Sequence, residues 1–179
     1  MKRKIYDKLL QWKSEKDGTT ALMIEGARRI GKSYIVERFA EKEYESYILI
    51  DFSKAPARVR SWFDEYLEDI DTLLQNIQLH YKKQLTPRKS LIIFDEVQKC
   101  PRAREAIKAL VEDHRFDYIE TGSLIAIKKN VDDILIPSEE DGIEMYPMDF
   151  EEFMWAMGDE VMYPYIRRCF ETNKPLGDF

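Results

Sequence analysis

Cysteine, glycine and proline are all scarce in this chain of 179 residues. It has two cysteines, Cys100 and Cys169, and seven residues each of glycine and proline. Two cysteines at this spacing form neither a disulfide framework nor a metal-ligand pattern, which favours a reducing, cytoplasmic location. So few glycines and prolines exclude a collagen-like or linker-like chain.

Long hydrophobic runs are also missing. No apolar stretch approaches the roughly 18 residues that a membrane helix needs, so we expect no membrane partner. The basic N-terminus has no apolar stretch behind it and is therefore not a secretory signal. We interpret Lys2, Arg3 and Lys4 as a solvated terminus. A hydrophobic content of 44% is enough to build the core of one ordinary domain.

Positive charge is absent from one segment. Residues 130–166 contain no Lys or Arg and 11 acidic residues, whereas residues 1–129 carry 25 basic and 21 acidic side chains. A body so close to charge balance gives little support for a nucleic-acid partner. The acidic segment indicates either a second functional surface or simply a solvated acidic face.

The apolar pattern predicts strands that alternate with helices. Short apolar runs between turn signals predict strands at residues 21–25, 46–52, 90–94 and 116–120, with a fifth at 143–146. Helical spacing is found at residues 3–16, from 33, from 59 to 77 with a break near Asp71, and from 101. This alternation predicts an α/β fold with a mostly parallel sheet.

The last part of the chain predicts a further helix. Asp149, followed three residues later by Glu152, is typical of a capping box, and Gly158 would end the helix. We interpret the late methionines as core residues, with an adaptable contact surface as the alternative. They are Met145, Met148, Met154, Met157 and Met162.

One motif carries specific chemistry. Residues 26–33 fit the P-loop pattern G-x-x-x-x-G-K-[ST] and lie between a predicted strand and a predicted helix. Such a loop cradles phosphates with backbone N–H groups, Lys32 can reach the β- and γ-phosphates, and Ser33 can ligate Mg²⁺. An ordinary strand-to-helix turn is the alternative. The expected nucleotide-binding residues are Gly26, Ala27, Arg28, Arg29, Ile30, Gly31, Lys32, Ser33 and Tyr34, together with Thr121 and Ser123 later in the chain.

Two acids end the third predicted strand. Residues 91–96 read Leu-Ile-Ile-Phe-Asp-Glu, the pattern of a Walker B segment. Asp95 would hold Mg²⁺, and Glu96 would polarise an attacking water. The alternative is that the two acids only end the strand. After the fourth strand, Thr121 and Ser123 can serve as a phosphate sensor or as ordinary turn residues.

Other nucleotide chemistries fit less well. The segment after Asp95 lacks the D-x-x-G of a GTPase, and residues 173–176 (Asn-Lys-Pro-Leu) lack the acid of a guanine-reading N-K-x-D. A kinase would need an Arg-rich lid, whereas Lys128 and Lys129 are the basic residues of positions 124–166. His80 and His114 have no ligand partner at a useful spacing and are interpreted as structural.

Four segments in order resemble a known family. GARRIGKS, IIFDEVQKCP, ETGSLIAI and YPMDFEEFMWA are similar to those of prokaryotic AAA-type ATPases, often called archaeal-type, in which a C-terminal region follows an ATPase core. The resemblance covers about residues 6–158. It implies a P-loop three-layer sandwich with strand order 5-1-4-3-2, and ATP and Mg²⁺ as ligands.

The resemblance also implies roles for residues. It assigns residues 26–33 to Walker A, 95–96 to Walker B and 121–123 to the sensor region. Relatives run on further, so we expect a truncated chain: an ATPase core at 1–147, and a helical segment at 148–179 that starts a lid or further domain. No motif assigns an arginine finger to Arg28, Arg29, Arg167 or Arg168.

The expected function is therefore an ATP-hydrolysing nucleotide switch. Glu96 and Lys32 would be catalytic, Ser33 and Asp95 would hold Mg²⁺, and ATP or ADP would control a following domain, a partner or another copy of the chain. The alternative is a module that holds nucleotide with little hydrolysis and docks partners through its acidic, Met-rich segment.

Overall fold

Five parallel strands form a single sheet in the computed structural model, which describes residues 2–123 and 139–177. The order across the sheet is β2-β3-β4-β1-β5, which confirms the predicted order 5-1-4-3-2 when it is read from the other edge. Neighbouring strands pair in parallel throughout. The strands are β1 (Ala21–Gly26), β2 (Ser46–Asp51), β3 (Ser90–Asp95), β4 (Asp117–Ser123) and β5 (Glu140–Met145).

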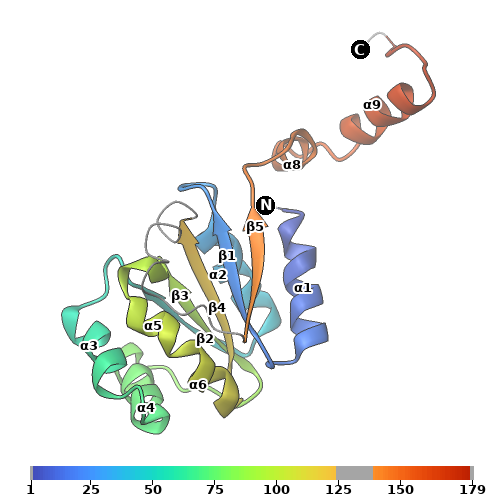
Figure 1. Cartoon of the computed structure of the whole chain (residues 1–179). Coiled ribbons are helices and arrows are strands. Elements are labelled where there is room, and N and C mark those ends of the chain that lie inside the picture. Colours follow the sequence, from blue (N-terminus) through green and yellow to red (C-terminus); the bar gives the residue numbers. More distant parts are fainter. Residues whose placement is uncertain (1, 124–138, 178–179) are drawn as a thin grey trace.

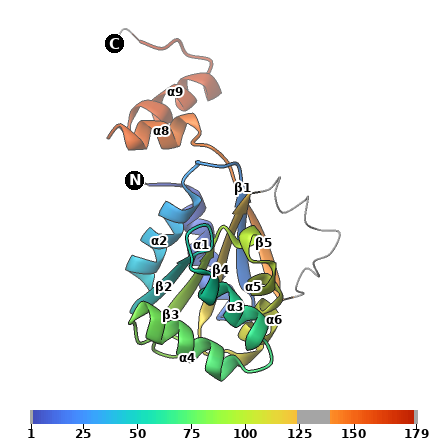
Figure 2. The same ribbon diagram turned by 90° about the vertical axis from the view of Figure 1, so that its left-hand side faces the viewer.

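Helices cover both faces of the sheet, which confirms the three-layer α/β sandwich (Figure 1, Figure 2). One face carries α1 (Ile5–Lys16) and α2 (Lys32–Glu43). The other carries α3 (Ala57–Glu65), α4 (Ile70–Tyr81), α5 (Pro101–Glu105) and α6 (Ile107–Asp113). A 3₁₀ turn, η1 (Val97–Lys99), follows β3. Beyond the carboxyl end of β5, α8 (Phe150–Ala156) and α9 (Met162–Glu171) extend away from the sheet.

Alternating side chains of the strands divide the interior into two cores. Ala21 and Met23 of β1 face the core beneath α3–α6, whereas Leu22 and Ile24 face the core beneath α1 and α2. Successive side chains of a strand point to opposite faces, so a central strand buried on both sides reads as a continuous apolar run. That is why the strand predictions at 21–25 and 90–94 are nearly exact.

The boundaries of two elements differ from those expected. The break in the long helix lies at residues 66–69, where Asp69 accepts the backbone N–H of Thr72 at 3.1 Å and caps α4. The fifth strand begins at Glu140 rather than Ile143, because it pairs with β1 from Ala21 onward. Lys128 and Lys129 lie outside the described residues.

The predicted capping box at α8 is confirmed. Asp149 accepts the N–H of Glu152 at 2.9 Å, and the Glu152 side chain accepts the N–H of Asp149. The apolar face of this helix is nevertheless largely open to solvent, and Glu152 is its buried residue. Met145 is buried, but the core interpretation is wrong for Met148 and Met157. Large exposed apolar side chains from this region are Tyr146, Met148, Phe150, Phe153, Met157, Val161, Tyr165 and Phe170.

Three other expectations concern thiols, membranes and histidines. Cys100 and Cys169 are free, buried thiols, and no described helix is long and apolar enough to cross a bilayer.

His114 ends α6 in the left-handed conformation, and its Nδ1 lies 3.2 Å from the carbonyl oxygen of Gly18. His80 packs edge-on against Trp62. The contacts of both histidines agree with the structural role predicted for them.

A buried carboxyl lies inside the sheet beside an ion pair. Arg104 of α5 donates to both carboxylate oxygens of Glu140, at 2.8 and 3.2 Å, and both side chains are about nine-tenths buried or more. Glu120 of β4 is fully buried, and neither of its oxygens has a hydrogen-bond donor within the described chain. Burial and the neighbouring Glu140 carboxyl both raise the pKa of Glu120 well above 4.5, against the opposing charge of Arg104.

This arrangement makes stability depend on pH. The folded state keeps a proton on Glu120 that the unfolded chain releases above about pH 4.5, so the stabilisation present at low pH is lost as pH rises toward the folded pKa. A Gln side chain at position 120 has nearly the shape of the protonated carboxyl and is neutral at every pH. We expect Glu120→Gln to raise the free energy of unfolding at pH 8 by about 1–3 kcal/mol, and to flatten its decline between pH 5 and 8.

Urea unfolding at pH 5, 6.5 and 8 measures this effect. Glu112→Gln on α6 is the matched control, because the Glu112 side chain is 62% exposed. A pH dependence that is identical in wild type and Glu120→Gln would show that Glu120 is ionised in the folded protein.

Candidate nucleotide-binding site

Glycine is required at both ends of the P-loop. At Gly26, φ is +155°, and a Cβ atom would lie 2.3 Å from the carbonyl oxygen of Met145, too close for any side chain. At Gly31, φ is +94°, and this residue caps α2 without a side-chain hydrogen bond. Glycine has no side chain that could cap the first N–H groups of α2, and free N–H groups at a helix N-terminus can receive an anion.

Lys32 lies within the curve of this loop. Its ammonium donates to the carbonyl oxygens of Gly26 at 3.0 Å and Ala27 at 2.8 Å, and the residue is only 6% exposed. Burial lowers the pKa of Lys32, while the nearby carboxylates of Glu96 and Asp95 act in the opposite direction. A buried ammonium held by two neutral carbonyls is well placed to exchange them for phosphate oxygens.

The residues predicted to form Walker A and Walker B are joined by hydrogen bonds. The Ser33 hydroxyl donates to Asp95 Oδ1 at 2.7 Å, and the Thr121 hydroxyl donates to the same oxygen. Thr121 also accepts the backbone N–H of Glu96 at 3.3 Å. Parallel pairing of β3 with β4 and of β4 with β1 brings these residues to one edge of the sheet. Thr121 therefore positions the Walker B acids, which is more than a turn residue does.

Glu96 follows β3 directly and has an unusual backbone. Its φ of 55° is left-handed, which turns the side chain out of the strand direction at the start of η1. Gln98 Nε2 donates to Glu96 Oε2 at 2.5 Å and fixes one carboxylate oxygen. No motif in the sequence indicates Gln98, because its contact with Glu96 depends on the left-handed backbone at that residue.

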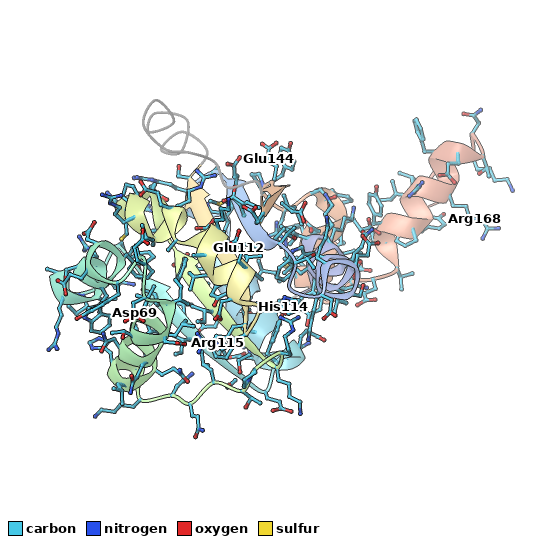
Figure 3. All side chains as sticks on the ribbon, turned by 60° about the horizontal axis from the view of Figure 1, so that its bottom comes forward. Asp69, Glu112, His114, Arg115, Glu144 and Arg168 are labelled. Carbon is cyan, nitrogen blue, oxygen red and sulfur yellow. The ribbon has the colours of Figure 1, made fainter. Side chains whose placement is uncertain are left out.

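Some expected site residues lie outside the hydrogen-bonded group of Ser33, Asp95 and Thr121. Ser123 is buried opposite Gly26 in the β4–β1 register, and within the described chain its side chain makes no hydrogen bond to Lys32, Ser33, Asp95 or Glu96. Tyr34 is 43% exposed, and the Arg38 guanidinium lies 5.6 Å from its ring centroid. Arg168 lies on α9, away from the sheet (Figure 3). Nothing in the described chain makes it an arginine finger for this site.

A cavity of about 520 Å³ lies along α2, from Tyr34 in its first turn to Lys42 in its last. Tyr34, Ile35 and Arg38 of α2 form one wall, Tyr6 of α1 forms another, and Trp155 of α8 closes one side. The lining of the cavity is mostly aromatic and cationic, also includes Asp7 and Leu10, and contains no residue of the P-loop itself. The cavity is large enough to take a base and ribose.

The interpretation of Arg3 as part of a solvated terminus is wrong. The residue is 4% exposed, because its guanidinium reaches into the gap between the P-loop and α8. Lys2 and Lys4 have exposed side chains, as expected for a terminus. The sequence gives no signal that separates Arg3 from its two basic neighbours.

The donor set fits a magnesium ion bound together with phosphates. The described residues contain no cluster of three His, Cys, Asp or Glu side chains that holds a metal by itself. Ser33 and Asp95 present a hydroxyl and a carboxylate oxygen 2.7 Å apart, and Mg²⁺ prefers such oxygen ligands completed by phosphate and water.

The AAA_14 family model, described as an AAA domain, matches residues 18–154, well over half of the chain. The chain belongs to this family. The match includes the P-loop, the Walker B acids and the start of α8, and the parallel sheet is that of a P-loop domain. No significant match was found among curated proteins.

Comparison with solved structures finds the fold of this AAA domain in another ATPase. The Walker-type ATPase PABY2304 of Pyrococcus abyssi matches with a TM-score of 0.51 and 17% identity over 98% of this chain and 60% of that one. PCH-2 of C. elegans matches with a TM-score of 0.39 and 16% identity, over 94% of this chain and 44% of its own. The AAA domain thus spans about 60% of the length of the P. abyssi ATPase.

Proposed function

We propose that this AAA domain binds ATP with Mg²⁺ and hydrolyses it, and that the bound nucleotide acts as a switch on α8, α9 and whatever they contact. The observation that carries the proposal is the chain of contacts in which Ser33 and Thr121 both donate to Asp95 beside the buried ammonium of Lys32. It brings Walker A, Walker B and the sensor threonine to one point.

Nucleotide binding would use groups that the P-loop already presents. The N–H groups at the start of α2 and the Lys32 ammonium would receive the phosphates, and Lys32 would exchange its two loop carbonyls for charged oxygens. Ser33 and Asp95 would hold Mg²⁺, which supplies charge neutralisation at the phosphates when it is bound. The cavity bordered by Tyr34 would receive the base and ribose.

Hydrolysis needs a group that orients water. Glu96 is the candidate, because Gln98 fixes one carboxylate oxygen at 2.5 Å and leaves the other available. The backbone N–H of Glu96 donates to Thr121, which itself donates to Asp95, the proposed metal ligand. This link would report the state of the phosphates to the water-positioning acid.

The second candidate is a module that holds nucleotide and docks partners with little hydrolysis. The exposed apolar side chains of α8 and α9 favour it, since they offer contact area for another domain, a partner or a second copy of the chain. Residues 148–177 would then be the output segment of either function. A cytoplasmic location is part of the proposal, and the two free thiols support it. The near charge balance of residues 1–129 offers little support for nucleic acid as a partner.

We expect Mg-ATP to stabilise the folded domain. A ligand that binds only the native state at 100 times its Kd adds about 2.7 kcal/mol, or roughly 5–10 °C in Tm for a domain of this size. Thermal melts with Mg-ATP, with ATP and EDTA, and without nucleotide measure this shift. The full shift should need both Mg²⁺ and ATP, and an unchanged Tm at millimolar Mg-ATP would refute nucleotide binding.

A further inference from the structure

Arg3 connects three segments that are distant in the sequence. Its Nη1 donates to the carbonyl oxygen of Ile30 in the P-loop at 3.1 Å, and its Nη2 donates to that of Tyr146, just after β5, at 2.8 Å. Its Nε forms an ion pair with Glu152 Oε1 of α8 at 3.2 Å. Both charged side chains are more than nine-tenths buried.

The Glu152 carboxylate, which pairs with Arg3, makes two further contacts. Its Oε1 accepts the backbone N–H of Lys4 at 2.7 Å, and its Oε2 completes the capping box with the N–H of Asp149 at 3.2 Å. A single carboxylate thus holds the N-terminal segment, starts α8 and neutralises Arg3. Glu152 is the buried residue of α8, so this carboxylate is the buried contact between the helix and the rest of the domain, beside the more exposed ion pairs of Lys4 with Asp149 and Glu151.

We infer that Arg3 is a positioning residue that couples the P-loop to α8. The guanidinium is planar: its two Nη groups donate to the carbonyl oxygens of Ile30 and Tyr146, while its charge pairs with the Glu152 carboxylate beside Nε. An ammonium does not hold three groups in such a fixed geometry. Ile30 directly precedes Gly31, whose left-handed φ sets the entry to α2. If the loop shifts when it binds phosphates, the contact of Arg3 with Ile30 changes. Because Arg3 also pairs with Glu152, the position of α8 on the domain then changes as well.

This inference rests on the proposed function for its ligand, ATP, but not for its first test. Arg28 and Arg29 are exposed in the loop and are open to trypsin. Without nucleotide, Arg3→Gln should speed tryptic cleavage at these two sites several-fold, because proteolysis follows the population of locally opened loop. Hydrogen exchange of the α8 amides should rise in the same variant.

The matched control is Lys4→Gln. Lys4 is the next residue and also pairs with the C-terminal segment, through Asp149 and Glu151, but its side chain is 44% exposed. Its backbone N–H still reaches Glu152 in the variant. Loop cleavage and α8 exchange in Lys4→Gln should therefore match the wild type. Equal loop cleavage in Arg3→Gln and wild type overturns the inference.

A double-mutant cycle on ATP affinity tests the coupling itself. Arg3→Gln and Glu152→Gln should each raise the Kd for Mg-ATP by roughly tenfold, and the double variant should be no weaker than the singles. Gln at 152 keeps the capping box, so Glu152→Gln carries the test alone if Arg3→Gln does not fold. A purely structural role predicts unchanged Kd values in the folded variants, or additive losses, and either result overturns the coupling.

The two proposals fail in different ways. If the wild type binds no Mg-ATP, the proposed function is wrong, and the nucleotide-free cleavage still decides whether Arg3 fixes the loop. If the wild type binds Mg-ATP and both variants bind it equally well, the function stands and the coupling through Arg3 is refuted.

Discussion

Lys32→Ala should remove nearly all of the stabilisation that Mg-ATP gives this AAA domain. The Lys32 ammonium is buried at the centre of the P-loop, and it is the side-chain cation that the structure places there. Charge-assisted contacts between an ammonium and phosphates are worth about 3 kcal/mol, so we expect the Kd to rise on the order of 100-fold. At a nucleotide concentration of 100 times the wild-type Kd, the stabilisation would fall from about 2.7 to about 0.4 kcal/mol.

The experiment compares Tm with and without Mg-ATP in three proteins: wild type, Lys32→Ala and Lys108→Ala. Lys108 lies on α6 and is 59% exposed, so its variant carries the same substitution away from the site. The control should keep the full shift. Lys32→Ala must also fold without nucleotide, which the Tm of the free variant shows. A full shift in Lys32→Ala would place ATP outside the P-loop.

The sequence predicts the sheet well because burial leaves a clear pattern. Strands covered on both faces, such as β1 and β3, must be apolar throughout, and turn residues mark their ends. The P-loop follows a strand and starts a helix, so its position next to the carboxyl ends of β3 and β4 follows from the topology. The contact between Ser33 and Asp95, 62 positions apart, is therefore predictable from motif and fold together.

Contacts set by a single side chain are not predictable in this way. Arg3 lies between two other basic residues, and nothing in its spacing indicates that it turns inward while Lys2 and Lys4 remain exposed. The burial of Arg3 depends on Glu152, which is about 150 positions away and which the sequence identifies only as part of a cap. The contact between Gln98 and Glu96 likewise depends on the positive φ at Glu96, which no sequence pattern indicates.

The apolar face of α8 shows a different limit. Helical spacing of Phe150, Phe153 and Met157 is the same whether the face packs inside the domain or against something else. In the structure these side chains are 48–69% exposed. Periodicity therefore predicts that a face is apolar but not what covers it.

Glu96→Gln should separate binding from turnover. The amide has nearly the same shape as the carboxylate, and Gln98 can still donate to its oxygen, so the loop after β3 should keep its geometry. It cannot take a proton from water, and removal of a general base typically slows the step by roughly 10²–10⁴-fold. We expect an unchanged thermal shift with Mg-ATP and a loss of steady-state phosphate release of that size.

Asp95→Asn provides the contrast. Asp95 accepts hydrogen bonds from both Ser33 and Thr121 and is the proposed metal ligand, so its loss should weaken Mg²⁺ dependence and ATP binding together. Glu112→Gln on α6 controls for the substitution itself, since Glu112 is exposed and distant from the P-loop. The comparison requires that wild-type phosphate release is well above background.

The outcome at Glu96 decides between the two candidate functions. A switch driven by hydrolysis needs an acid that positions water, and Glu96 is the acid that the structure places beside Asp95 with one oxygen fixed by Gln98. If wild type and Glu96→Gln release phosphate at equal, measurable rates, Glu96 is not that base, and its contact with Gln98 is only structural. If the wild type binds Mg-ATP without measurable release, the nucleotide-holding module is favoured, and the exposed apolar faces of α8 and α9 become the main route to its partners.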